Sequence, residues 1–379
     1  MSFPPAGFGT VTLARASRQS REERRLRRFA LARIAGVVRI AWVVLTATVT
    51  MSLARPATAA EPLGLEERLD AILASRALRG ARVAVLVVTR REGRVVYARD
   101  PDRALVPASN LKILTAIAAL SAFGPTHRFT TELFAERAPD VDGAIEVLTV
   151  RGGDPALTSE AVWRMTADLR RLGVRRIRWG LRLDDSGFDG ERWHPSWGPV
   201  SARAYHAPVG ALTVNYGAFA VEVSAGAKTG DPLRVNLDPP IPFLRLSNRG
   251  RTGPARSRLS LSVDRKPANG VEQVLVTGAV PAGSPAEIYY RSVRDPARYA
   301  GAVIRAQLAA NGIDVGDGTE IGPVPPTAAL LLAFEGLPLS EVVRRMVKFS
   351  NNAIAESLVK ALGARMTGGP GTWKSGIRA

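Results

Sequence analysis

The sequence of 379 residues contains no cysteine. Disulfide bonds, thiolate metal ligands and cysteine nucleophiles are therefore excluded. Histidine is almost as scarce, because only His127, His194 and His206 occur, so we do not expect a histidine-rich metal site. No motif indicates a cofactor. We therefore expect a protein that works without a metal or a cofactor.

Basic residues outnumber acidic ones, but the excess is not organised as a nucleic-acid-binding surface. The formal charge is +18, and residues 1–60 supply +8 of it from ten Arg and two Glu, which leaves +10 for the other 319 residues. That remainder is dispersed, and no basic stripe alternates with aromatic residues. We expect no nucleic-acid partner, whereas attraction to an anionic cell envelope stays open.

Residues 1–60 have the pattern of an export signal. A basic run from Arg15 to Arg33 precedes an uncharged, mostly apolar run from Ile40 to Leu53, and residues 57–60 have the small side chains of a signal-peptidase site. The apolar run has 14 residues, fewer than the roughly 20 that a spanning helix needs. We predict a signal peptide over residues 1–60 and export to the periplasm or cell envelope. A retained N-terminal anchor is the alternative.

Residues 107–120 predict a short polar turn that leads into a strongly apolar helix, which we expect to be buried on most sides. Ser109 and Lys112 are three residues apart and so share a helix face. A hydroxyl at a helix N-terminus beside a desolvated amine suits a serine nucleophile with a lysine base. The structural alternative is that Ser109 is an N-cap and Lys112 extends toward solvent. Ser357 and Lys360 repeat the spacing inside a predicted helix, and we interpret that copy as chance.

The predicted elements divide residues 61–379 into two helical regions with a β segment between them. A helix over residues 65–78 and a strand pair at 82–88 and 94–97 precede the Ser109 helix. Residues 129–284 are mostly short strands broken by Gly, Pro and Asp, and they look like an inserted β domain. Within this segment we predict a helix over residues 161–172 and strands over residues 129–134, 145–150, 177–183, 218–223, 259–263 and 271–277. Helices return after Asp295-Pro296, an N-cap and first-turn pair. We therefore predict one domain made of residues 61–128 and 285–379, interrupted by the insert.

Several motifs occur in an order typical of a known family. Ser109-x-x-Lys112 followed by Ser350-x-Asn352 is the motif pair of penicillin-interacting serine enzymes. The surrounding segments are VPASNLK (106–112), GGDP (152–155), APVGALTVN (207–215), KFSNN (348–352) and GPGTW (369–373). Together they resemble the D-Ala-D-Ala carboxypeptidase/endopeptidase family, the class C low-molecular-mass penicillin-binding proteins, over residues 61–379. Taken alone, SNN is a helix interruption and Asp154 in GGDP is a turn residue.

The resemblance implies an α/β (α+β) transpeptidase/β-lactamase-like domain with a largely β inserted domain. It implies that Ser109 attacks the D-Ala-D-Ala bond, or a D-Ala–diaminopimelate cross-link, of peptidoglycan stem peptides. Lys112 would be the general base, Ser350 would relay a proton to the leaving group, and Asn352 would hydrogen-bond Lys112 and the substrate amide. β-Lactam antibiotics would be inhibitors.

The sequence departs from the family at the third motif, a Lys-Thr-Gly expected after Asn352. Residues 228–230 spell this motif, but they precede the second motif and read as a turn between two strands. We still expect a serine-type D-Ala-D-Ala carboxypeptidase/endopeptidase. The missing motif leaves a C-terminally truncated, catalytically impaired form and a non-catalytic peptidoglycan-binding relic as alternatives. A Ser-Lys esterase or β-lactamase on the same fold is a further alternative.

Overall fold

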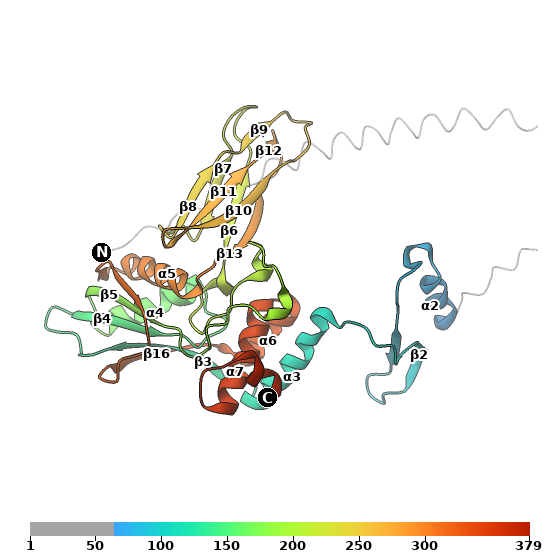
Figure 1. The fold of residues 1–379 in the computed structure, drawn as a ribbon, viewed down its shortest axis with the longest axis horizontal. Helices are drawn as coiled ribbons and strands as arrows, with labels where there is room; N and C mark the ends of the chain where they lie inside the picture. Colours follow the sequence, from blue (N-terminus) through green and yellow to red (C-terminus); the bar gives the residue numbers. More distant parts are fainter. Residues whose placement is uncertain (1–63) are drawn as a thin grey trace, which may run out of the picture. The chain divides into compact units, whose positions relative to one another are not determined.

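The computed structural model describes residues 64–379, which form two compact units, one ending at Leu105 and the other running from Val106 to Ala379 (Figure 1). The predicted signal peptide over residues 1–60 lies outside the described residues. Within residues 64–379, no helix has both the length and the hydropathy of a membrane span.

The first unit is a helix followed by a two-stranded antiparallel sheet. Its elements are α2 (Leu65–Leu73), a 3-10 turn (Arg76–Leu78), β1 (Val85–Val88) and β2 (Val95–Arg99). The Tyr97 hydroxyl donates to Asp70 Oδ1 at 2.5 Å and joins the sheet to the helix. Leu86 and Val95 are each more than half exposed. The predicted strand pair is confirmed, and so small a sheet leaves apolar side chains in contact with solvent.

The second unit contains a six-stranded mixed sheet in the order β14-β5-β4-β3-β16, with β15 also paired to β5. Strand β3 is antiparallel to β4 and β16, and β5 is parallel to β4, β14 and β15. The strands are β3 (Arg128–Ala135), β4 (Ala144–Arg151), β5 (Arg176–Asp184), β14 (Asp314–Val315), β15 (Gly318–Ile321) and β16 (Ala329–Pro338). The predicted strands at 129–134, 145–150 and 177–183 are confirmed.

Helices α4 (Ser159–Arg171) and α5 (Pro296–Ala310) cover one face of this sheet (Figure 1). Thr158 caps α4, whose Val162, Met165 and Leu169 are completely buried, because apolar residues three and four apart share one face. Asp295 caps α5 by accepting the Arg298 N–H at 3.0 Å, and Pro296 is in the first turn, as predicted.

Short strands form a second, β-rich part of the same unit, where three small sheets pair in the orders β13-β6-β7, β10-β11-β8 and β12-β9. They are β6 (Ala218–Ser224), β7 (Arg234–Asp238), β8 (Leu244–Asn248), β9 (Arg251–Gly253), β10 (Ser262–Ala268), β11 (Val271–Thr277), β12 (Ala279–Pro281) and β13 (Glu287–Ser292). The strand predicted at 259–263 corresponds to β10, which begins three residues later because pairing with β11 begins at Ser262.

One buried cluster contains side chains of β3, β4 and β5 together with α5 and β16. The last two elements lie within residues 285–379, which the sequence assigned to a separate domain. The division into 61–128 with 285–379 and an insert over 129–284 stays a prediction. What the packing adds is that α5 and β16 share their core with strands of the predicted insert.

The helices that hold the Ser–Lys motif form a separate small core. They are α3 (Leu111–Phe123), α6 (Leu339–Lys348), α7 (Asn352–Thr367) and α8 (Trp373–Arg378). In α3 only Lys112, Ala116 and Ala119 are buried, because this one stripe faces α6 and α7. Leu114 and Ile117 are 62% and 59% exposed. The prediction that this helix is buried on most sides is therefore wrong.

Asp154 in the GGDP turn is buried and forms no ion pair with any of residues 64–379. It is 4% exposed, and its Oδ1 accepts the Ala156 N–H at 2.8 Å, which is the turn bond expected of an aspartate. A Cβ at residue 336 would meet Asp154 Oδ2, so a larger residue in place of Gly336 would have to displace the Asp154 carboxyl. Burial raises the pKa of Asp154 to about 6.

Replacing Asp154 by asparagine is expected to remove a pH-dependent loss of stability. The pKa of Asp154 is higher in the folded than in the unfolded chain, so the carboxyl stabilises the fold while it is protonated at low pH. As the pH rises from the unfolded pKa through about 6, the free energy of unfolding falls by about 3 kcal/mol. Asn retains the acceptor for Ala156 and does not ionise. Urea unfolding below the unfolded pKa and at neutral pH tests this: the variant should gain stability relative to the native chain only at neutral pH. An equal difference under both conditions contradicts the assignment.

Candidate active site

Ser109 lies in a 3-10 turn, Ala108–Asn110, that runs directly into α3. Ala108 has φ 45°, a left-handed conformation that is uncommon for a residue with a side chain. Such strain is found often at functional sites. Ser109 itself is exposed. The turn therefore presents the hydroxyl to solvent at the start of the helix.

Lys112 connects the two motifs. Its Nζ lies 3.1 Å from Ser109 Oγ and donates to Asn352 Oδ1 at 2.6 Å, although Lys112 and Asn352 are 240 residues apart. The lysine is only 9% exposed, and burial lowers its pKa below the ordinary value. A lysine with a lowered pKa is neutral in a larger fraction of molecules, so its amine can accept a proton from a neighbouring hydroxyl.

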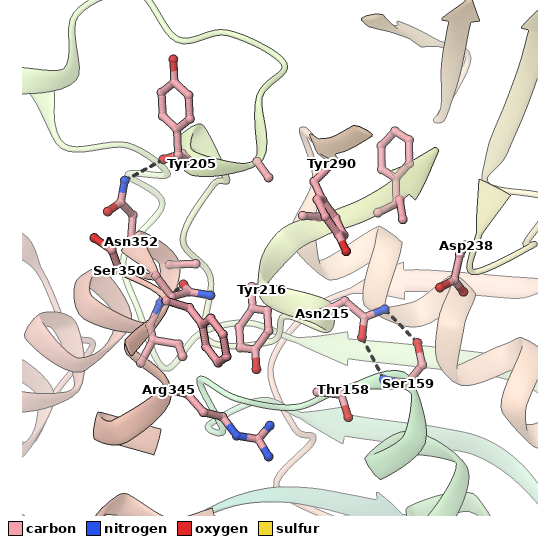
Figure 2. Close-up of a pocket in the computed structure, with 18 of the residues that line it drawn as sticks. Thr158, Ser159, Tyr205, Asn215, Tyr216, Asp238, Tyr290, Arg345, Ser350 and Asn352 are labelled. Carbon is pink, nitrogen blue, oxygen red and sulfur yellow. Dashed lines mark hydrogen bonds between the residues drawn. The ribbon is translucent and has the colours of Figure 1, made fainter. Parts of the chain in front are cut away.

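A second contact determines the orientation of the Asn352 amide. Asn352 Nδ2 donates to the Tyr205 carbonyl at 3.0 Å (Figure 2), so its carbonyl oxygen faces Lys112. Asn352 begins α7, and Asn351 caps that helix by accepting the Ile354 N–H at 3.0 Å. The amide is therefore held at both ends, by Lys112 and by the segment between β5 and β6.

Ser350 is close to this group but is not bonded to it. It is exposed, it has φ 52°, and among residues 64–379 its hydroxyl forms no hydrogen bond with Ser109 or Lys112. The structure thus brings together three of the four predicted site residues, Ser109, Lys112 and Asn352. It places Ser350 on the turn just before α7.

Glu356 is a charged neighbour that the sequence analysis missed. It lies one turn after Asn352 on α7, accepts the Trp197 indole N–H at 2.7 Å, and has its pKa raised by burial. Its carboxylate favours the protonated form of Lys112 and so opposes the effect of burial there. The i, i+4 spacing from Asn352 is the sequence signal that would have indicated it.

Both false copies of the motifs have structural explanations. Lys360 is completely buried and donates to Asp189 Oδ1 and the Glu191 carbonyl, each at 2.5 Å, with its Nζ 4.5 Å from the Trp373 ring. It holds the loop after β5 on α7. Residues 228–230 form a turn between β6 and β7, closed by Asp231 N–H donating to the Lys228 carbonyl at 3.1 Å.

No metal centre is indicated in the part of the chain that the structure describes, where no group of three His, Cys, Asp or Glu side chains lies together. The site is a serine–lysine–asparagine group on a mixed α/β body. A serine at a helix N-terminus beside a desolvated lysine is the arrangement of serine enzymes that use a lysine as the base.

Comparisons with known proteins identify the family. A model of the D-Ala-D-Ala carboxypeptidase 3 (S13) family matches residues 65–379. The chain is 39% identical over 323 residues to a D-alanyl-D-alanine carboxypeptidase of Actinomadura sp. (strain R39), covering 83% of this chain and 60% of that protein. It is 24% identical over 310 residues to D-alanyl-D-alanine carboxypeptidase DacB of Haemophilus influenzae, covering 79% and 63%. The chain belongs to the D-Ala-D-Ala carboxypeptidase 3 (S13) family, which confirms the resemblance.

Solved structures confirm the fold class. The crystal structure of penicillin binding protein 4 (dacB) from H. influenzae aligns with a TM-score of 0.65 at 23% identity, covering 78% of this chain and 65% of that one. The same protein complexed with a novel β-lactam aligns with a TM-score of 0.61 at 24% identity, covering 79% and 65%. The chain spans about three fifths of the length of the curated relatives it matches.

Proposed function

We propose that this chain is a serine-type D-Ala-D-Ala carboxypeptidase/endopeptidase that acts on peptidoglycan stem peptides through an acyl-enzyme on Ser109. The observation that supports this most directly is the position of Lys112 Nζ, within hydrogen-bond distance of both Ser109 Oγ and Asn352 Oδ1. Family membership supports the proposed substrate class, because both curated relatives are named for D-alanyl-D-alanine.

In the proposed reaction, Ser109 Oγ attacks the carbonyl carbon between the last two D-alanines while its proton passes to Lys112 Nζ. The carbon–nitrogen bond then breaks, and Ser350 relays a proton from Lys112 to the departing amine. This leaves an ester between Ser109 and the shortened peptide. Water then attacks the ester carbonyl while its proton passes to Lys112 Nζ. The ester bond breaks, and Lys112 returns that proton to Ser109 Oγ, which restores the hydroxyl and the neutral amine.

Asn352 has two roles in the proposed reaction. Its carbonyl oxygen holds Lys112 Nζ in place without adding a charge that would favour the ammonium. Its orientation is maintained by the bond to the Tyr205 carbonyl. In the complete Michaelis complex the same amide would also hydrogen-bond the substrate.

Three further parts of the proposal concern partners and location. β-Lactams would acylate Ser109, in keeping with the β-lactam complex of the structurally similar protein. Residues 1–60 would direct export to the periplasm or cell envelope. Residues 61–128 and 285–379 would form the penicillin-binding domain around a β insert, with no nucleic-acid partner and no cofactor.

The test is the intact mass of the chain after incubation with penicillin, with Ser109→Ala as the control. We expect a stable increase equal to one penicillin in the native chain and none in the variant. An unmodified native chain that remains folded contradicts the proposed acyl-enzyme. An adduct that persists in Ser109→Ala contradicts the choice of nucleophile.

Replacing Asn352 by aspartate is expected to shift the pH dependence of acylation. A carboxylate in this position stabilises the Lys112 ammonium, so the Lys112 pKa rises and the neutral base forms only at higher pH. The rising limb of the acylation profile should move toward alkaline pH by on the order of one unit, with a slower rate at neutral pH. Stopped-flow measurement with a chromogenic cephalosporin gives this profile.

Asn351→Asp is the matched control for that experiment. It adds the same charge one residue away, and aspartate still caps α7. Its profile should shift much less, because the Asn351 side chain bonds to the Ile354 N–H, whereas Lys112 bonds to Asn352. Equal shifts in both variants would show a general field effect and no specific role for the Asn352–Lys112 bond.

A further inference from the structure

A cavity of about 700 Å³ opens beside the candidate active site (Figure 2). It lies between the β-rich part and the helices. Its walls come from the start of α4, from β6, β7 and β13, and from the segment between α6 and α7. Ser350 and Asn352 line both the cavity and the candidate site, whereas Ser109 and Lys112 do not line the cavity. The proposed reaction therefore does not use most of this space.

The aromatic residues that line the cavity include Tyr205, Tyr216, Tyr290 and Phe349. Tyr205, Tyr290 and Phe349 are 49%, 59% and 70% exposed. The rings of Tyr216 and Tyr290 lie on the same side of the close-up, whereas the Tyr205 ring points away from them (Figure 2). Exposed aromatic side chains that gather around one hollow indicate a binding surface, because isolated exposure is common but clustering is not. Their flat apolar faces suit a ligand that is itself flat and apolar on one side.

Three residues that line the cavity have strained backbone. Asn215, Tyr216 and Ser350 have φ of 51°, 60° and 52°, which residues other than glycine adopt rarely. Asn215 is fixed by hydrogen bonds, since its Nδ2 donates to Ser159 Oγ at 2.8 Å and its Oδ1 accepts the Ser159 N–H at 2.9 Å. Such strain persists where the surrounding structure maintains it and is concentrated at ligand sites.

The polar groups of the cavity are of mixed charge. Glu160 and Asp238 supply carboxylates that form no ion pair within residues 64–379, and Arg345 supplies a guanidinium whose Nε donates to Glu341 at 2.9 Å. With two carboxylates against one cation, an anionic ligand such as a phosphate is disfavoured. Planar carboxylate, amide and guanidinium groups suit a ligand with many hydroxyl and amide groups.

A peptide in extended form fits the wall less well. Strand addition requires a free sheet edge, but β6, which forms much of the wall, is the central strand between β13 and β7. A pyranose ring presents one apolar C–H face and an edge of hydroxyl groups. The combination of aromatic faces and planar polar groups matches that distribution.

We propose that this cavity binds N-acetylated amino sugars of a glycan strand. The proposal rests on the proposed function, since it assigns the cavity to the glycan of the same peptidoglycan whose stem peptide reaches Ser109. Tyr290 and Asp238 lie away from Asn352 in Figure 2. The sugar would occupy that end of the cavity, and the attached peptide would extend toward Ser350 and Asn352.

The test is titration of the Ser109→Ala chain with chitotetraose and with glycan strands freed of their peptides by an amidase, followed by calorimetry. We expect saturable binding of both, weakened about tenfold in Tyr290→Ala and in Phe349→Ala. Trp163→Ala is the matched control, because Trp163 is also half exposed but lies outside the cavity. Its affinity should equal that of the parent chain.

Other outcomes overturn the proposal. The proposal is wrong if neither glycan binds to a folded chain, or if the affinity is unchanged in Tyr290→Ala and Phe349→Ala. It is also wrong if the free stem peptide binds at this cavity in place of the glycan. Penicillin acylation of the native chain is measured in parallel. Glycan binding without acylation would refute the proposed reaction alone, and acylation without glycan binding would refute the cavity assignment alone.

Discussion

Replacing Lys112 by methionine is expected to slow acylation of Ser109 by penicillin by about 10²–10⁴-fold, the usual contribution of a general base. Methionine fills a similar volume on the buried stripe of α3 but cannot accept the Ser109 proton. The loss should therefore appear in the acylation rate and leave the fold intact. Stopped-flow acylation and a thermal melt of the same samples measure the two effects.

The pH dependence adds a second measurement to this prediction. Because burial lowers the Lys112 pKa, the native rate should rise with pH through a value below that of an ordinary lysine. The variant should lack that rise. Lys228→Met is the matched control, since Lys228 lies in the false Lys-Thr-Gly turn and should leave the rate unchanged. A native-like rate and pH profile in Lys112→Met would exclude Lys112 as the base.

Replacing Asp189 by alanine is expected to destabilise the chain by roughly 3–5 kcal/mol, the range found when one partner of a buried ion pair is removed. Lys360 is completely buried and would lose its bonded carboxylate, while the Glu191 carbonyl and the Trp373 ring would remain beside it. Since the pair joins the loop after β5 to α7, its loss should also loosen that loop. Urea unfolding measures the change.

The double variant Asp189→Ala with Lys360→Met should recover much of that loss, because it removes the unpaired charge and retains an apolar side chain of similar size. Asp314→Ala is the surface control. It breaks the exposed pair with Arg176, where the Arg176 and Asp314 side chains are 63% and 70% exposed, and should have no measurable effect. If the double variant is no more stable than Asp189→Ala, the charge of Lys360 is not the cause.

Local patterns in the sequence were sufficient for most elements and for half of the site. The strands β3, β4, β5 and β11 and the start of α5 follow from periodicity, capping residues and turns, which depend on near neighbours in the chain. Ser109 and Lys112 are three residues apart, so helix geometry alone predicts that they share a face. Their hydrogen-bond distance in the structure agrees with that expectation.

Asn352 was connected to this pair only through the resemblance to a family. No local rule relates residues 240 positions apart, and SNN by itself reads as a helix interruption. The structure provides the physical reason: α7 packs on the Lys112, Ala116 and Ala119 stripe of α3 and brings Asn352 to the lysine. The family fold was predictable because the motif order is preserved across the chain.

What the sequence alone determined was therefore the local elements, the Ser109–Lys112 pair, the false status of residues 228–230 and, through motif order, the family. Only the tertiary structure decided that α3 exposes Leu114 and Ile117, that Glu356 lies beside the lysine, and that aromatic residues line a cavity next to Asn352. These features depend on which surfaces meet in space. Pairwise contacts between distant segments leave no periodic pattern in the chain, so sequence reasoning from near neighbours does not reach them.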